Sequence, residues 1–148
     1  MRRSSSTAAR SWCSRAVDVA RIVFLDLKAI LAIHRRMLAE AGGDEGILKP
    51  DGLESAIASA KATYAKQFLN AFPFEMAASY LIGFTQNHAF VDGNKRVAAV
   101  AAVMFLRLNG YRLTLTSAEL AELIFAVARG EATKPAVVQR LKQASQLG

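Results

Sequence analysis

Nine consecutive residues, His88 to Arg96 (HAFVDGNKR), hold the side chains best suited to chemistry in this chain. An imidazole ordinarily titrates near neutral pH, so His88 can take a proton from an attacking hydroxyl. Asp92 offers a hard anionic oxygen, which suits a magnesium ion that also touches substrate phosphates. Arg96 can grip a phosphate through two parallel hydrogen bonds, and Lys95 can add a point charge. The combination predicts a phosphate site.

The residues that follow place this segment at the start of a helix. Ala98 to Leu108 is rich in good helix formers, and Asn109-Gly110 is a common helix stop, so the helix should begin near Asn94. A helix start leaves about four backbone N–H groups unpaired and carries roughly half a positive charge. Gly93 permits a positive φ and a close approach of backbone to ligand. An anion should therefore bind at this helix start.

Each of these residues also has a purely structural interpretation. A lone histidine is more often structural than catalytic, and Asp92-Gly93 is an ordinary turn pair before a helix. Exposed Lys and Arg side chains such as Lys95 and Arg96 normally only form part of the solvated surface. Phe90 is expected to anchor the loop in the core rather than to touch a ligand. The spacing favours the functional interpretation, because five separate signals fall within nine residues.

The segment resembles the His-x-Phe-x-Asp-(Gly or Ala)-Asn-Lys-Arg signature of the Doc branch of the Fic/Doc family. Other stretches resemble family segments and stand in family order, and together they cover roughly residues 24 to 143. These stretches are Ile33 to Arg36 with Gly42-Gly43, Asp51 to Ala56, and Phe105 to Tyr111.

The resemblance implies a small helical enzyme that moves part of a nucleoside triphosphate onto a protein hydroxyl, with ATP as co-substrate and Mg²⁺ as cofactor. It implies that His88 is the general base and that Asp92 is the magnesium ligand. Arg96 would also act in catalysis as a phosphate clamp. The phosphate-binding residues implied by the family signature are Gly93, Asn94, Lys95 and Arg96.

Two positions indicate which part of the nucleotide moves. Nucleotidyl-transferring Fic proteins usually carry Gly-Asn-Gly-Arg with a second Arg three residues later, whereas this chain has Lys95 for the second Gly and Ala99 for the later Arg. This is the Doc pattern, and Doc toxins are associated with phosphorylation of elongation factor Tu, which halts translation. The resemblance therefore implies a toxin with protein kinase activity toward a translation factor. One position argues against the Doc pattern, because Gly93 is the residue that ordinary Fic proteins carry there, rather than Ala.

Two other classes of function stay open. Transfer of AMP or another nucleotidyl group to a protein hydroxyl is the first alternative. A catalytically silent interaction module, or a nucleic-acid binder, is the second.

The sequence lacks the inhibitory pattern found in many Fic proteins, in which Ser or Thr stands four positions before a Glu that precedes Gly or Asn. Glu45-Gly46 fails the test because Ala41 occupies the required position. The resemblance therefore implies that a separate antitoxin protein restrains the toxin, typically through a disordered segment that folds onto it.

Composition predicts one compact domain in a reducing compartment. The chain has 148 residues, of which 53% are hydrophobic and 21% charged. A chain of this length and composition can bury a hydrophobic core without disulfides or structural metal ions. The single Cys13 cannot form an internal disulfide. No apolar run approaches the roughly 20 residues that cross a bilayer. We therefore expect a cytoplasmic bacterial protein with no membrane partner.

The net charge of +7 is concentrated at one end of the chain. Residues 1 to 24 contain five Arg and one Asp, a net +4, which leaves +3 for the remainder. This distribution argues against direct binding to nucleic acid. Residues 1–23 are interpreted as a basic arm rich in Ser, Ala and Arg, either disordered or outside the native protein, and residues 24–148 as the Fic/Doc-like catalytic domain.

Periodicity predicts an all-α bundle of about six helices with one short extended segment. A first helix should end at Gly42-Gly43 and a second should begin at Pro50. A third should span Phe74 to Gln86 and deliver His88 at its end. The apolar face of the first helix is expected to contain Leu27, Ile30, Leu31, Met37, Leu38 and Ala41, and that of the third Ala77, Tyr80, Leu81 and Phe84.

Beyond the motif helix, Tyr111 to Leu115 should be extended. Thr116 and Glu119 form a candidate capping box for a helix that ends at Gly130, and Pro135 can start the last helix.

A short segment between the first two helices is a candidate substrate flap. In Fic/Doc proteins such a flap aligns the target segment by strand-like pairing; the alternative is a plain loop between helices. Its residues are Gly46, Ile47, Leu48 and Lys49.

Overall fold

The computed structural model describes residues 21–148, and these form a compact helical fold. Most of them lie in six helices, and the strands are two or three residues long. In chain order the elements are α2 (Leu27–Ala41), α3 (Pro50–Ala60), β1 (Thr63–Tyr64), β2 (Gln67–Phe68), α4 (Phe74–Gln86), α5 (Asn94–Leu108), β3 (Tyr111–Leu113), α6 (Ser117–Ala128), α7 (Lys134–Gln143) and β4 (Ser145–Leu147).

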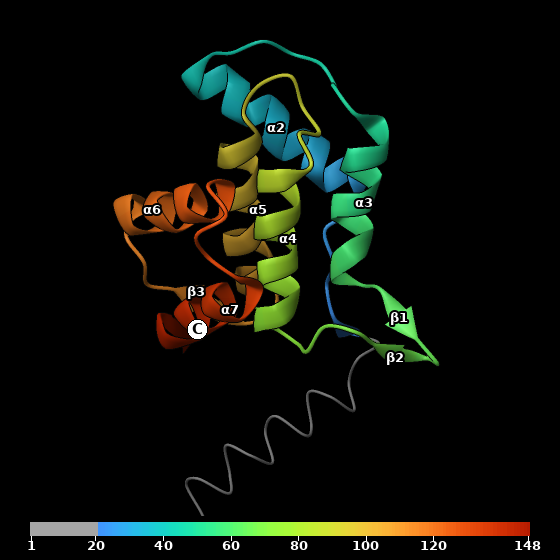
Figure 1. The fold of residues 1–148 in the computed structure, drawn as a ribbon, viewed down its shortest axis with the longest axis vertical. Coiled ribbons are helices and arrows are strands. Elements are labelled where there is room, and N and C mark those ends of the chain that lie inside the picture. The colour runs from blue at the N-terminus through green and yellow to red at the C-terminus, as the bar shows by residue number, and fades with distance from the viewer. Residues whose placement is uncertain (1–20) are drawn as a thin grey trace, which may run out of the picture.

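Helix α4 is the centre of the fold, and α3, α5, α6 and α7 all pack against it (Figure 1). Small residues on α4 allow its neighbours to approach closely. A Cβ added at Gly83 would lie 3.2 Å from the Cα of Ala56, so α3 packs directly on the α4 backbone here. Because neighbours surround it, most of α4 is buried. Its buried residues are Phe74, Met76, Ala77, Ala78, Ser79, Tyr80, Leu81, Phe84 and Thr85.

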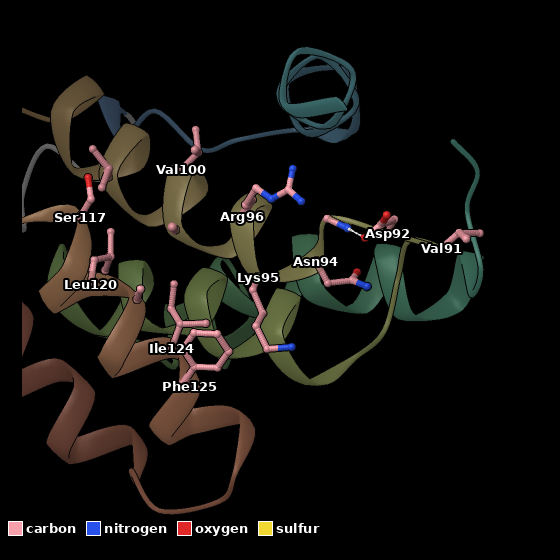
Figure 2. A pocket seen from close by; sticks show the side chains of 14 residues that line it. Val91, Asp92, Asn94, Lys95, Arg96, Val100, Ser117, Leu120, Ile124 and Phe125 are labelled. Atoms are coloured by element: carbon pink, nitrogen blue, oxygen red, sulfur yellow. Dashed lines mark hydrogen bonds between the residues drawn. The ribbon is translucent and has the colours of Figure 1, made fainter. Parts of the chain in front are cut away.

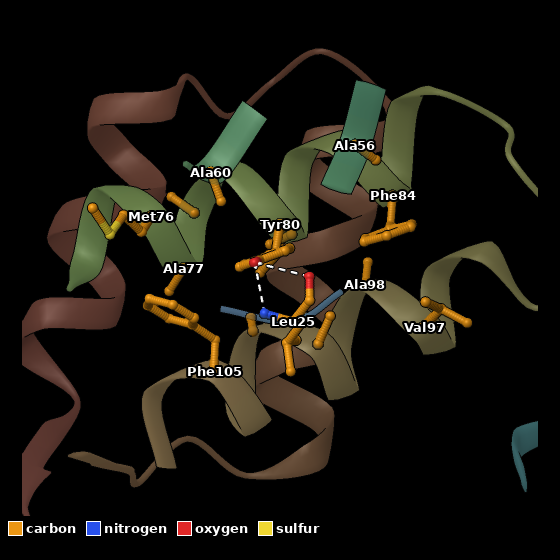
Figure 3. Close-up of a cluster of buried hydrophobic side chains, with 14 of the residues drawn as sticks. Leu25, Ala56, Ala60, Met76, Ala77, Tyr80, Phe84, Val97, Ala98 and Phe105 are labelled. Carbon is orange, nitrogen blue, oxygen red and sulfur yellow. Dashed lines mark hydrogen bonds between the residues drawn. The ribbon is translucent and has the colours of Figure 1, made fainter. Parts of the chain in front are cut away.

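The chain before α2 is fixed to this core by a buried tyrosine. The Tyr80 hydroxyl accepts a hydrogen bond from the Leu25 N–H at 2.9 Å and donates one to the Leu25 carbonyl at 3.3 Å (Figure 3). Burial raises the pKa of Tyr80 to about 12. Nearby, the Val23 backbone exchanges two hydrogen bonds with the Asn109 side chain, each 2.9 Å long. The segment therefore packs against both α4 and α5.

The loop between α4 and α5 lies at the same end of the bundle as the connection between α2 and α3 (Figure 1). Ile47 of that connection forms an antiparallel bridge with Phe90 of the loop. The fold thus brings together the two segments to which the sequence analysis gave functional roles.

The all-α prediction is confirmed, and the third helix occupies the predicted range with its four named residues buried. The capping box is present, since Thr116 Oγ1 accepts from the Glu119 N–H and Glu119 Oε1 accepts from the Thr116 N–H. The second helix begins at Pro50, as expected, and the last helix begins one residue before Pro135.

The apolar face predicted for the first helix is partly wrong. Leu27 is 46% exposed and Ala41 is also exposed, while the buried residues are Ile30, Ile33 and His34. The reason is that only a narrow stripe of α2 contacts α5 and the loop before it, so the two ends of the helix reach solvent.

Two strand pairs were not anticipated. The hairpin β1–β2 pairs Thr63 with Phe68, and β4 pairs with β3 so that Leu113 faces Ser145. The extended segment predicted for Tyr111 to Leu115 is thus shorter, ending at Leu113. Most of the basic arm predicted for residues 1–23 lies outside the described residues. No helix in the described part combines the length and apolar character that crossing a bilayer requires.

We expect Tyr80→Phe to destabilise the protein by about 1–3 kcal/mol at neutral pH, because the buried Leu25 N–H loses its acceptor. The free energy of unfolding, measured by urea denaturation, checks this. A variant of the exposed Glu122, Glu122→Ala, is the control and should change stability by less than about 0.5 kcal/mol.

The same residue should make stability sensitive to alkaline pH. Since the Tyr80 pKa is raised from 10.0 to about 12 in the folded protein, the neutral hydroxyl stabilises the fold fully below pH 10, and this contribution is lost as pH rises through 12. Unfolding free energies at pH 9 to 12 should therefore fall more steeply for the wild type than for Tyr80→Phe. Parallel curves for the two proteins would contradict the assignment.

Candidate active site

The site begins where α4 ends. Helix α4 stops at Gln86, and two residues later His88 adopts a positive φ of 50°, with its side chain exposed. A positive φ is uncommon outside glycine, although histidine is among the residues that adopt it more readily. The two following residues, Ala89 and Phe90, are completely buried. The chain therefore turns sharply at His88, which leaves the imidazole at the surface next to a firmly anchored loop.

The side chain of Asn94 closes this loop on the first turn of α5. Asn94 Oδ1 accepts from the Phe90 N–H at 2.9 Å, and Asn94 Nδ2 donates to the Phe90 carbonyl at 2.8 Å. Both ends of the amide are thus occupied within the loop. The Asn94 side chain is thus a clamp on the loop backbone, and the Asn94 backbone N–H has no partner among the described residues.

The first turn of α5 has free hydrogen-bond donors. Gly93 is the N-cap with φ of 86°, a left-handed conformation that glycine adopts without strain, and no side chain caps the helix. Val97 N–H bonds to the Gly93 carbonyl, but within the described residues no partner is found for the N–H groups of Asn94, Lys95 and Arg96. Together with the helix dipole, these donors make the turn suited to phosphate.

The two cations of the motif leave α5 in different directions (Figure 2). Lys95 extends toward α6, and its Nζ lies 5.7 Å from the ring centroid of Phe125. Arg96 points away from Phe125 on the same turn. Neither forms an ion pair with another described residue. No described carboxylate therefore neutralises either charge.

Asp92 has the donor atoms that a magnesium ion bound to phosphate requires. Its Oδ1 accepts from the Gly93 N–H at 2.9 Å, and its Oδ2 lies 3.4 Å from the Asp44 N–H. The carboxylate is partly exposed and keeps further lone pairs for a metal. The described residues contain no cluster of three or more His, Cys, Asp or Glu. Asp92 is the residue of this site with the chemistry to hold Mg²⁺, an ion that usually takes one or two carboxylates together with substrate phosphates and water.

A pocket of about 710 Å³ begins at the motif and runs between α5 and α6 (Figure 2). Its polar end is formed by the motif residues from Asp92 to Arg96, and its walls are mainly apolar. The wall residues are Val91, Ala99, Val100, Val103, Ser117, Leu120, Ala121, Ile124 and Phe125. The pocket has the size and the mixed lining of a small-molecule site.

The candidate flap lies directly on the motif loop. The Gly46 carbonyl accepts from the Val91 N–H at 3.1 Å, and the Ala89 carbonyl accepts from the N–H groups of Leu48 and Lys49 at 2.8 and 3.1 Å. Because backbone groups alternate in direction along an extended strand, the N–H and carbonyl of Ile47 point to the opposite edge. One edge of the segment is thus paired with the motif loop and the other faces outward.

The structure gathers Asp92, Gly93, Asn94, Lys95 and Arg96 around one pocket. His88 does not line that pocket, but it belongs to the same loop, and the flap pairs with the residues next to it.

One contact was missed by the sequence analysis: the buried His34 of α2 stacks on Phe90. The available signals were that the chain has only two histidines and that His34 lies in a family-like segment. Neither signal indicates a contact between residues 56 positions apart in the sequence.

Comparison with known proteins shows the family to which the chain belongs. Residues 24–106 match the profile of the Fic/DOC family. The chain is 33% identical to the protein named "Protein kinase doc" of Escherichia phage P1 over 114 residues, which cover 77% of this chain and 89% of that protein. It is 39% identical to "Toxin Doc" of Mycolicibacterium smegmatis over 74 residues, covering 49% of this chain and 55% of the relative.

The fold, the motif and these matches define the class. The chain belongs to the Fic/Doc family. Within the family, the two relatives described above are Doc proteins.

Asn94→Ala should destabilise the fold by about 1–3 kcal/mol, because the N–H and carbonyl of Phe90 each lose a partner in a partly buried place. Chemical denaturation of the variant and the wild type measures this difference. Gln86→Ala, a change at an exposed residue of the preceding helix, serves as the control. Equal stability of Asn94→Ala and the control would show that the clamp contributes nothing.

Proposed function

We propose that this protein is the toxin of a toxin–antitoxin pair and transfers the γ-phosphate of a nucleoside triphosphate, ATP, to a hydroxyl of a protein. The observation that carries the proposal is the uncapped first turn of α5, where Asp92, Lys95 and Arg96 line one pocket. The 33% identity to a protein named as a kinase supports phosphoryl transfer.

In this proposal the target hydroxyl oxygen attacks the γ-phosphorus and gives its proton to the imidazole of His88. The bond from the γ-phosphorus to the bridging oxygen breaks, and its electron pair leaves on ADP. The free N–H groups of Asn94, Lys95 and Arg96 and the two side-chain cations hold the phosphates in line. A magnesium ion held by Asp92 would neutralise phosphate charge.

The shape of the pocket supports a nucleotide as the ligand. Phosphates at the cationic end would leave the nucleoside in the apolar part between α5 and α6, next to the half-exposed ring of Phe125. Ala99 lines this part, one turn after Lys95. Since an alanine leaves space where nucleotidyl-transferring Fic proteins carry an arginine, the nucleotide can extend along α5.

The flap supports a protein as the acceptor. The outward backbone groups of Ile47 offer an edge on which an extended target segment can pair. Ile47 and Leu48 are 44% and 56% exposed, so their side chains can also contact the target. The hydroxyl would then lie beside the loop that carries His88. We propose a translation factor such as elongation factor Tu as the target, in the bacterial cytoplasm.

The proposal includes a separate antitoxin as the second partner. The name "Toxin Doc" of one relative supports it, as does the lack of an inhibitory pattern around Glu45-Gly46.

The labelled phosphate of ATP distinguishes the candidate reactions. We expect the purified protein, incubated with bacterial lysate and Mg²⁺, to label a protein from γ-labelled ATP and not from α-labelled ATP. Label from α-labelled ATP would instead indicate nucleotidyl transfer. No label from either would contradict the proposed enzyme and favour a silent interaction module.

Replacement of the proposed base should remove the activity. Asparagine cannot act as a base at neutral pH but accepts a positive φ, so His88→Asn removes the imidazole while keeping the turn. We expect transfer to fall by roughly 10²- to 10⁴-fold. Glu122→Ala should retain full activity, and unchanged thermal unfolding of His88→Asn would show that the loss is chemical. A fully active His88→Asn would exclude His88 as the base.

A further inference from the structure

The other histidine of the chain, His34, lies beneath the motif loop. His34 of α2 is only 6% exposed, and its ring stacks on Phe90 with centroids 3.8 Å apart and planes 11° from parallel. Its Nε2 lies 2.9 Å from the backbone carbonyl oxygen of Asp92. A carbonyl oxygen only accepts hydrogen bonds, so Nε2 must carry a proton and donate it.

The loop after α2 contacts the carboxylate of Asp92. The Asp44 N–H lies 3.4 Å from Asp92 Oδ2, and a Cβ at Gly43 would lie 2.8 Å from that oxygen. Gly43 also has a φ of 126°, which side-chain-bearing residues rarely adopt. Helix α2 and its following loop therefore contact Asp92 at both its carbonyl and its carboxylate.

The hydrogen bond from His34 holds the carbonyl side of the Asp92–Gly93 peptide, while the N–H side of that peptide donates to Asp92 Oδ1. Asn94 fixes the backbone of Phe90, and the flap fixes the N–H of Val91. The peptide carbonyl of Asp92 follows these anchors, and among the described residues the one hydrogen-bond partner found for it is His34. Rotation of this peptide would turn the Gly93 N–H away from Asp92 Oδ1 and so release the carboxylate.

We propose that His34 is a positioning residue, which orients the Asp92 peptide so that the carboxylate faces a metal-bound triphosphate and Gly93 keeps its capping conformation. This rests on the proposed function. Groups behind a metal ligand commonly change metal affinity by about 10- to 100-fold when they are removed. His34 would act in this way through the backbone of the ligand rather than through its carboxylate.

The competing explanation is that His34 only fills space under Phe90. Two substitutions separate the explanations, because each keeps one property of the imidazole. His34→Phe keeps an aromatic ring for stacking but has no N–H donor. His34→Gln keeps an N–H donor at a similar reach but cannot stack.

The two variants are compared with the full-length wild type in two measurements. One is amide hydrogen exchange at Val91 and Gly93, which needs no ligand. The other is the Mg²⁺ concentration required for binding of a non-hydrolysable ATP analogue. For His34→Phe with near wild-type thermal unfolding, we expect exchange at Gly93 and the Mg²⁺ requirement each to rise at least about tenfold. His34→Gln should stay close to the wild type in both.

Wild-type values for His34→Phe in both measurements would overturn the proposal and leave a space-filling role. If His34→Phe fails to fold, His34→Gln tests the proposal instead. A folded His34→Gln whose Gly93 exchange and Mg²⁺ requirement rise by the same factor of about ten would contradict the proposal.

A direct readout does not depend on any variant: the nitrogen chemical shifts of the wild-type ring should show the proton on Nε2. A neutral ring with its proton on Nδ1 would exclude the hydrogen bond.

These readouts are separate from the proposed reaction. If the wild type transfers no phosphate, the proposed function fails, while exchange at Gly93 and the ring tautomer still decide the role of His34.

Discussion

The pair of hydrogen bonds between the Asn94 side chain and the Phe90 backbone is the contact on which the candidate site depends. It joins the buried anchor of the loop to the first turn of α5. Because the amide satisfies both backbone groups of Phe90, the intervening residues from Val91 to Gly93 are held as a closed turn. Asp92 and the free donors of α5 consequently line the same pocket.

This small turn is supported by a much larger framework. Helix α4 is enclosed by four other helices and ends two residues before His88. Tyr80 on α4 holds the segment before α2, and α2 in turn brings His34 under the loop. Each wall of the site is therefore attached to the same buried helix. The rigidity of the core is what allows a site built on a loop to keep a defined geometry.

Local signals in the sequence were enough to predict the helices and the polar end of the pocket. Helix formers after Asn94, the stop at Asn109-Gly110 and the capping box at Thr116 each act within a few residues, so they can be identified without the fold. The β4 strand and the contact of His34 depend on partners that packing brings together. The hairpin Thr63–Phe68 is local, but its turn residues Ala65 and Lys66 adopt positive φ without being Gly, Asn or Asp, so no turn signal marks it in the sequence. The exposure of Leu27 shows the same limit, because periodicity does not reveal how much of a helix its neighbours cover.

The pairing of the flap with the motif loop has a thermodynamic consequence. Gly46, Leu48 and Lys49 bond to the loop on one edge, while the backbone groups of Ile47 face outward on the other edge, where the proposed target would pair. A segment added to the outer edge would restrict the motion of the strand that braces the loop, and an ordered loop would in turn restrict the strand. Under the proposed function, affinity for the acceptor and affinity for the nucleotide would then be reciprocally linked, so that each ligand would favour the binding of the other.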